Sequence, residues 1–402
     1  MFEIEYDNCV IDGPGFAKAM NMLLVDGLST PDNPMPISPD RQWGALKMAQ
    51  DMALMAAQNK MGGGIQSITT DSGVHAVDVL WRPDFTKEQA SYDFLCKDTD
   101  CESFRQHRTC VNTKISVPFC IENCETDNYD PQNARYVDIE VEPGTGKTVR
   151  IPIAFVQTLE SAIVGLIDKV NEFAIESLDA SIGINVSTGD TVPVPVPVLT
   201  TAGAPNPLGQ TKLNRIKTDN GFGRYAVVGS GNFMDYDTLS GWTSTSAGGV
   251  AGVIPQFAKS YYTFYNDASA DDVFGPNNFI MVNSGMFQFL FLTENATPTW
   301  KSGNFDINNP FSLSTLSPSF KSGSFKGESY AFSVPLTKWI KGLAADVVIT
   351  AERCANGEFN CYRYKGYVYL KVGVFRAPLN LYRIADKFSG STGVVVGNAI
   401  IA

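Results

Sequence analysis

The residues best suited to covalent or metal chemistry are eight cysteines, and five of them crowd into residues 96–124. A structural zinc site usually contains cysteine pairs spaced C-x2-C, and this sequence has no such pair. The closest spacing joins Cys120 and Cys124, with three residues between them and no histidine near them. We therefore expect no metal centre. Free thiols in a loop-rich segment are one interpretation, and disulfides formed after release from a cell are the other.

Disulfides need an oxidising compartment, which a chain without an export leader does not normally reach. The dipeptide Asn356-Gly357 is a strong hairpin signal, and such a hairpin would bring Cys354 and Cys361 close together, although spacing alone does not make two thiols face each other. The candidate disulfide cysteines are Cys96, Cys101, Cys110, Cys120, Cys124, Cys354 and Cys361.

The sequence gives little support for histidine-based catalysis, because His75 and His107 are the only two histidines. The motifs G-x-S-x-G, H-E-x-x-H and G-x-G-x-x-G do not occur. Carboxylates cluster at residues 98–102, 122–130 and 267–272, and none of the clusters has the Asp-x-Asp-x-Asp-Gly loop that ends in a bidentate Glu. We interpret 127–130 as a solvated acidic loop, with an incidental cation site as the alternative. A distant carboxylate pair for glycoside hydrolysis stays open. We expect a chain that is not an enzyme and has no catalytic, cofactor-binding or metal-binding residues.

One short motif resembles a phosphate-binding loop, namely the run from Gly144 to Thr148, GTGKT. The motif also needs a glycine five residues before Gly146, where this sequence has Val141, and it should open directly into a helix. Here amphipathic strand patterns flank the run, and Pro152 separates it from the next predicted helix. We therefore do not expect nucleotide binding.

The composition predicts a folded protein with much of its surface covered by partners. Hydrophobic residues make up 44% of the 402 residues, and charged residues only 18%. A surface poor in charge and rich in Gly, Asn, Ser, Thr and aromatic residues suits protein–protein contact. The net charge of −11 disfavours a role of the whole chain in nucleic-acid binding, which needs a basic face. The sequence shows neither a signal peptide nor a membrane span, so we expect a soluble protein made and assembled in a cytoplasm.

The clearest predicted element is a long amphipathic helix over residues 152–182. Apolar residues recur at steps of three and four, Pro152 suits the first turn, and Gly183 suits the end. A coiled coil is the alternative, supported by fewer than three heptads. The apolar stripe consists of Val156, Leu159, Ile163, Leu166, Val170 and Phe173.

The rest of the chain is predicted as short helices, strands and long loops. Helices are expected at 16–25, 40–60 and 233–239, and strands at 74–81, 114–119, 225–229, 345–353 and 360–375. Residues 279–282 and 287–292 are predicted as two strands, or as a strand and a short buried helix. Residues 135–151 form a predicted hairpin, with the turn at 143–146. Residues 184–220 and 293–327 are predicted as loop-rich passages, and 389–402 as a small-residue tail.

The order of these elements resembles the major capsid proteins of tailed bacteriophages, the Hong Kong 97-like fold. The resemblance covers the whole chain but is architectural, because the family has no short diagnostic motif. It implies an α+β fold with a long spine helix, a peripheral β region, an axial α/β domain, an extended loop and an N-terminal arm. The implied division is 1–64 for the helical arm, 65–150 for the extended-loop region with its Cys-rich elaboration, 151–224 for the peripheral domain with the spine helix, 225–345 for the axial domain, and 346–402 for the closing strands and tail.

The resemblance also implies a function and partners. The chain would be a structural virion protein that self-assembles into hexamers and pentamers of an icosahedral capsid, enclosing DNA without reading its sequence. Scaffold, portal and decoration proteins are further possible partners, and no membrane is involved. Late disulfides in the segment from Cys96 to Cys124 could lock the shell. The expected inter-subunit contacts are Trp43, Met52, Pro143, Lys147, Trp300 and Phe305.

Three other classes of protein compete with this interpretation. A tail-tube subunit or another virion protein would share the low charge and the assembly surface, but should be mostly β and lack the long helix. A secreted or surface-binding protein would explain the cysteines but needs an export signal. An enzyme of an unrecognised family would have to work almost without histidine.

Overall fold

The computed structural model describes a little over half of the chain. The described residues are 43–49, 51, 64–71, 74–81, 105–111, 113–124, 136–142, 147–246, 262–283, 287–292, 329–336, 343–353, 361–376 and 392–402. The chain divides into two compact units. The first contains residues 1–40, 111–170 and 290–373, and the second contains 41–110, 171–289 and 374–402. Helices and sheets are mixed along the chain, which confirms the predicted α+β class.

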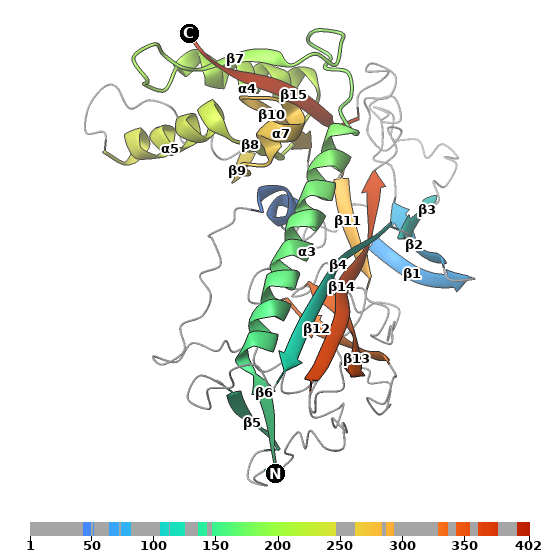
Figure 1. Ribbon diagram of the computed structural model, residues 1–402. Coiled ribbons are helices and arrows are strands. Elements are labelled where there is room, and N and C mark those ends of the chain that lie inside the picture. Colours follow the sequence, from blue (N-terminus) through green and yellow to red (C-terminus); the bar gives the residue numbers. More distant parts are fainter. Residues whose placement is uncertain are drawn as a thin grey trace, which may run out of the picture. The chain divides into compact units, whose positions relative to one another are not determined.

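An antiparallel sheet forms the centre of the first unit (Figure 1). Its long strand is β14 (Cys361–Arg376), which pairs with β13 (Ala344–Arg353) and with β4 (Thr113–Cys124). The order continues through β12 (Ser329–Pro335) beyond β13, and β11 (Phe287–Leu292) also bonds to β14. The aromatic and β-branched residues of these runs favour a pleated, half-buried surface.

Period-two alternation sets the two faces of this sheet. Lys114, Ser116 and Cys120 on β4 are exposed, whereas Val111 before them and Phe119 between them are buried. Phe119 lies opposite Gly366 of β14, and a Cβ atom at Gly366 would come within 2.6 Å of the Phe119 ring. The glycine therefore leaves room for the aromatic side chain of its cross-strand neighbour.

The long helix α3 (Ile153–Asp179) begins directly after the hairpin of β5 (Tyr136–Glu142) and β6 (Lys147–Pro152). Both the hairpin and the helix confirm predictions from the sequence. Leu159, Ile163, Leu166 and Val170 of the predicted stripe are buried. Within the first unit, a Cβ atom at Gly165 would lie 3.9 Å from the side chain of Val117 on β4, so the helix packs on this sheet. Residues up to Val170 belong to the first unit and those from Asn171 to the second.

The apolar stripe differs from the prediction at its C-terminal end and on its polar side. Phe173 is only half-buried, and Ala174, Ile175 and Leu178 are buried instead. Glu160, predicted on the polar face, is buried too. The buried face is also wider than the predicted stripe in the middle of the helix, where Ala162, Val164 and Ile167 are buried.

A five-stranded mixed sheet forms the core of the second unit, in the order β7-β15-β10-β8-β9. The strands are β7 (Val194–Leu199), β15 (Val394–Ile401), β10 (Asn278–Asn283), β8 (Tyr225–Gly229) and β9 (Tyr262–Asn266). The central pairs are antiparallel, and each edge strand runs parallel to its neighbour. The helices are α4 (Pro207–Asp219), α5 (Gly231–Ser246) and the short α7 (Ala270–Phe274).

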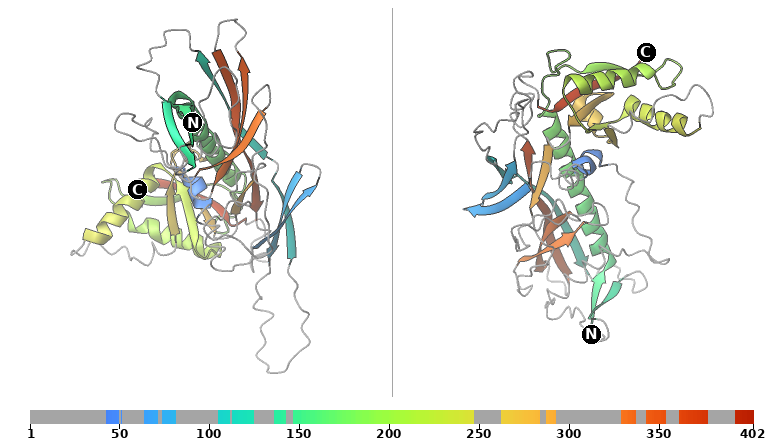
Figure 2. Two further views of the ribbon diagram at one scale, coloured as in Figure 1. Left: turned by 90° about the horizontal axis from the view of Figure 1, so that it is seen from below. Right: turned by 180° about the vertical axis from the view of Figure 1, so that it is seen from behind.

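Two elements of this unit correct the sequence prediction. Residues 207–219, predicted as part of a loop-rich passage, form α4, which runs beside β7 (Figure 2). Its signal was local: Asn206 accepts the N–H of Leu208, and Pro207 follows at the first helical position. Residues 394–401, predicted as a tail, form β15 inside the sheet, because a run of valines at its start pairs with β10 and the residues from Gly397 to Ile401 pair with β7.

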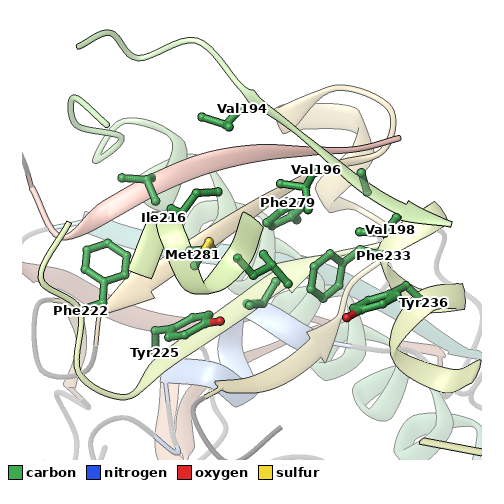
Figure 3. Close-up of a cluster of buried hydrophobic side chains, with 14 of the residues drawn as sticks. Val194, Val196, Val198, Ile216, Phe222, Tyr225, Phe233, Tyr236, Phe279 and Met281 are labelled. Carbon is green, nitrogen blue, oxygen red and sulfur yellow. The ribbon is translucent and has the colours of Figure 1, made fainter. Parts of the chain in front are cut away.

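Phe279 lies at the centre of the buried cluster of the second unit (Figure 3). Its ring centroid is 4.5 Å from that of Phe233 on α5. Glycines oppose it on both neighbouring strands, Gly229 on β8 and Gly397 on β15. A Cβ atom at Gly397 would come within 2.3 Å of the ring, so the glycine is required by the ring's position.

A smaller three-stranded sheet, β1 (Gly64–Asp71), β2 (Val74–Trp81) and β3 (Arg105–Val111), is also present.

Replacing Gly397 by alanine is expected to destabilise the chain by about 1–3 kcal/mol, because the new methyl group overpacks the Phe279 ring. The matched control is Gly223→Ala, where a Cβ atom would meet nothing within 4 Å and which should leave stability nearly unchanged. Urea unfolding of both variants measures the difference. Equal unfolding free energies of the two variants would contradict overpacking of the Phe279 ring by a methyl group at position 397.

Candidate functional site

The most specific polar arrangement in the described residues holds the segment 44–49 in place. This segment is helical, and its apolar side chains Ala45, Leu46, Met48 and Ala49 are all buried. It belongs to the second unit, together with the residues that bind it. A helix this short gains little stability from its own hydrogen bonds, so its position depends on the groups that receive it.

Asp267 caps the first turn of this helix. Its side chain is fully buried, and Oδ2 accepts hydrogen bonds from the N–H of Ala45 at 3.0 Å and from Nδ2 of Asn171 at 2.8 Å. Oδ1 accepts the N–H of Ser269 at 3.1 Å. The N–H of Leu46 donates to Oδ1 of Asn171 at 3.1 Å. First-turn N–H groups have no partner inside a helix, and here residues more than a hundred positions away supply one.

Close approach of the two backbones makes this arrangement possible. A Cβ atom at Gly44 would lie 2.4 Å from the carbonyl oxygen of Asn266, so a larger residue does not fit without movement. Beyond the segment, the hydroxyl of Tyr265 donates to Oδ2 of Asp51 at 2.8 Å. The strand β9 and the turn after it therefore contact the start of the segment and also the chain that follows it.

Burial dominates the electrostatics of this site. It raises the pKa of the Asp267 carboxyl group above its ordinary value of 3.8, although the hydrogen bonds from Ala45, Asn171, Ser269 and Gly44 oppose that rise. Burial also raises the pKa of Tyr265, and its hydrogen bond to Asp51 acts in the same direction. With its oxygens engaged by main-chain and amide donors, Asp267 is arranged to hold a segment of chain.

A second polar cluster lies where β8 ends and β10 begins. Oδ1 of Asn277 accepts the N–H of Asn232 in the first turn of α5, and Nδ2 of Asn232 donates to the carbonyl of Ala399 at 2.9 Å. Nδ2 of Asn398 donates to Oδ1 of Asn278 at 2.6 Å. Ligands often bind at the carboxyl ends of strands in α/β sheets, but here the asparagines tie helix and strands to one another. Among the described side chains, no group of three or more metal-binding residues gathers.

The structure describes only two of the six residues predicted to contact other subunits. Trp43 precedes the buried segment and is half-buried. Lys147 is the first residue of β6, opposite Glu142, and a strand rather than a helix follows the GTGKT run. Met52, Pro143, Trp300 and Phe305 lie outside the described residues.

The seven candidate disulfide cysteines are likewise only partly described. Cys110 on β3 and Cys120 on β4 are free thiols and exposed. Cys124 ends β4 and Cys361 begins β14. Cys96, Cys101 and Cys354 lie outside the described residues.

Four exposed apolar side chains of the second unit were not predicted from the sequence, and one of them is Met234 on α5. Leu208 in the first turn of α4 is 62% exposed, Ile401 at the end of β15 is 53% exposed, and Val192 precedes β7. The pairing of Ile401 with Leu199, and the bridge from Leu199 to Pro205, place the chain near Leu208 at the same end of the sheet. Periodicity finds buried faces, and it gives no signal for single exposed positions at the ends of elements.

Comparisons with known proteins give little further information. No protein-family model matches the chain, and no curated protein matches it. Among solved structures, a chain from Mycobacterium phage Che8 is similar over 81% of this chain and 84% of its own length, with 10% sequence identity and a TM-score of 0.32. A likeness of that size carries no argument about function. None of the described helices has the length and apolar character needed to cross a membrane.

Asp267→Asn should destabilise the chain by about 1–3 kcal/mol. Both carboxylate oxygens of Asp267 accept hydrogen bonds from N–H groups, and asparagine replaces one of these oxygens by an NH2 group, which cannot accept them. Amide hydrogen exchange should become faster at Ala45 and Leu46. Asp235→Asn, which removes an exposed carboxylate on α5, is the control and should change neither quantity. Unchanged protection at Ala45 in the Asp267 variant would contradict the capping role.

The raised pKa of Asp267 should make the stability of the chain depend on pH. Because its pKa is raised in the folded chain, the folded state keeps a proton that the unfolded state has already released, so stability falls as the pH rises from about 4 through the folded pKa. The difference in unfolding free energy between the wild type and Asp267→Asn should therefore be largest near pH 4 and decrease above it. A difference that grows with pH would show that the carboxyl group is stabilised in its ionised form.

Proposed function

We propose that this chain is a structural virion protein, the major capsid subunit of a tailed bacteriophage, which assembles into hexamers and pentamers of an icosahedral shell. One observation carries the proposal: a 27-residue helix that directly follows a β-hairpin and packs along an antiparallel sheet. In the capsid family, a long spine helix follows the extended loop in this way.

The order of the remaining elements supports the same proposal. Four strands of the α/β sheet, β7, β8, β9 and β10, follow the long helix in sequence, β13 and β14 come after them, and only β15 returns to the α/β sheet at the end. β14 then pairs with β4, which precedes the helix, so the antiparallel sheet is completed from both sides of the α/β region. That is the relation expected between an axial domain inserted into the chain and the closing strands of a peripheral domain.

The same observation disfavours the tail-tube alternative. A tail-tube subunit is expected to be mostly β, and α3, α4 and α5 together form a substantial helical part of the described chain. The buried Asp267 needs no substrate to explain it, because main-chain and amide donors occupy its oxygens. A non-catalytic role, with DNA enclosed but not read and with scaffold, portal or decoration proteins as partners, is part of the proposal.

Assembly would use broad edges, and the exposed end of the second unit's sheet offers one. Pro195 and Pro197 on the edge strand β7 lack N–H groups and oppose the addition of another strand there. Contact at this end is therefore expected through side chains, and Leu208 and Ile401 are the apolar side chains it exposes. Many modest contacts of this kind, repeated in a closed ring, give a stable shell.

Leu208→Lys is expected to reduce assembly at least tenfold, because a buried lysine charge at a repeated contact costs about 1.4 kcal/mol or more per interface. The matched control is Asn214→Lys, which adds the same charge at an exposed position further along α4 and should assemble normally. Mass photometry of both purified proteins measures the oligomers, and circular dichroism shows that both are folded. If both variants assemble as the wild type does, this edge is not a contact. If the wild type itself stays monomeric under every condition, the proposed function fails.

A further inference from the structure

We propose that Cys124 and Cys361 form an intrachain disulfide that links the end of β4 to the start of β14. These two residues are partners in the antiparallel register of the two strands. Residues directly opposite in an antiparallel pair have Cα atoms about 4.5 or 5.5 Å apart, and disulfides join Cα atoms about 4.4–6.8 Å apart. The backbone therefore places this pair within reach of a disulfide at either kind of position.

The register is continuous, which makes the pairing specific. Twelve consecutive partners join the strands from Cys361 and Cys124 to Val372 and Thr113, without a bulge. A slip of one residue would move Cys361 to the other face of the sheet from its partner. The fully buried Val368 and Leu370 on β14 oppose such a slip, because it would expose them.

The face on which these two strand positions lie carries exposed side chains further along both strands. Strand positions two apart share a face, so Cys124 shares the face of the exposed Lys114, Ser116 and Cys120. Cys361 similarly shares the face of the exposed Lys365 and Tyr367. On that face, Nζ of Lys114 lies 3.8 Å from the ring centroid of Tyr369. The α3 helix packs on the opposite face, where a Cβ atom at Gly165 would lie 3.9 Å from the Val117 side chain.

Other described cysteines are poorly placed to compete. Cys120 lies on the same strand as Cys124, and four strand residues span about 13 Å, too far for a disulfide. The partner of Cys120 in the register is Lys365. Cys110 is on β3, which belongs to a different sheet. The close spacing of Cys120 and Cys124 in sequence is therefore not a pairing.

The reaction is a thiol–disulfide exchange with a small-molecule disulfide such as oxidised glutathione. Both S–H bonds of the pair are broken and one S–S bond forms, while the reagent's S–S bond breaks and takes up the two electrons and two protons as two thiols. The product closes the chain between residues 124 and 361, which restricts the unfolded state and should raise the melting temperature. The inference does not depend on the proposed function.

The test is peptide mapping of the full-length wild type after incubation with oxidised glutathione, with free thiols alkylated before digestion without reductant. The expected result is a peptide containing Cys124 linked to the peptide containing Cys361, and near-complete loss of alkylation at both. In Cys124→Ser, Cys361 should become alkylated, whereas the control Cys120→Ser should retain the linked peptide. The melting temperature of the wild type should fall on reduction, and that of Cys124→Ser should not.

Three results would overturn the inference. Cys361 could be linked to Cys354, across the predicted turn at Asn356-Gly357. Either cysteine could be linked to a second chain, seen as a dimer in non-reducing electrophoresis. Both could remain alkylated while the exposed Cys110 and Cys120 are oxidised. Mapping of the wild type alone separates these results from the expected one, so the test does not depend on the variants folding.

Discussion

The second unit depends on the burial of one carboxyl group, that of Asp267. Water is excluded from it, so each of its oxygens must be satisfied by the chain, and the donors come from the segment 44–49, from α3 at Asn171 and from the turn before α7. These three parts are far apart in sequence. Moving any one of them leaves a buried polar group without its partner, and that cost is what gives the short N-terminal helix a single position.

In the first unit the corresponding constraint is the alternation of β4 and β14. One face carries exposed lysine, serine and cysteine side chains, and the other carries Phe119 and Val117 toward the core and the helix. A helix with one apolar stripe and a sheet with one apolar face bury each other, and this explains why α3 can be so long without being apolar all round. The α+β architecture follows from these two surfaces and from the separate valine-rich sheet of the second unit.

Much of this fold could be predicted from the sequence, because its signals are local. The pattern of α3, the hairpin at 136–152 and the strands β2, β8, β13 and β14 were found from periodicity and turn residues. α4 was missed although Asn206 and Pro207 mark its beginning, since prolines and glycines upstream suggested a loop. β15 was missed because a short valine run becomes a central strand only through partners more than a hundred residues away. The buried role of Asp267 was not predicted for the same reason: burial and long-range donors have no local signal. The five-part division and the contacts at Met52, Pro143, Trp300 and Phe305 remain predictions.

If the proposed function is correct, many copies of this chain form a closed shell. Negative-stain electron microscopy of the purified wild-type protein, with and without salt or a crowding agent, tests it most directly. We expect class averages with five-fold or six-fold rings, or closed shells. Stacked tubes would instead indicate a tail protein, and isolated monomers under every condition would contradict assembly as the function of this chain.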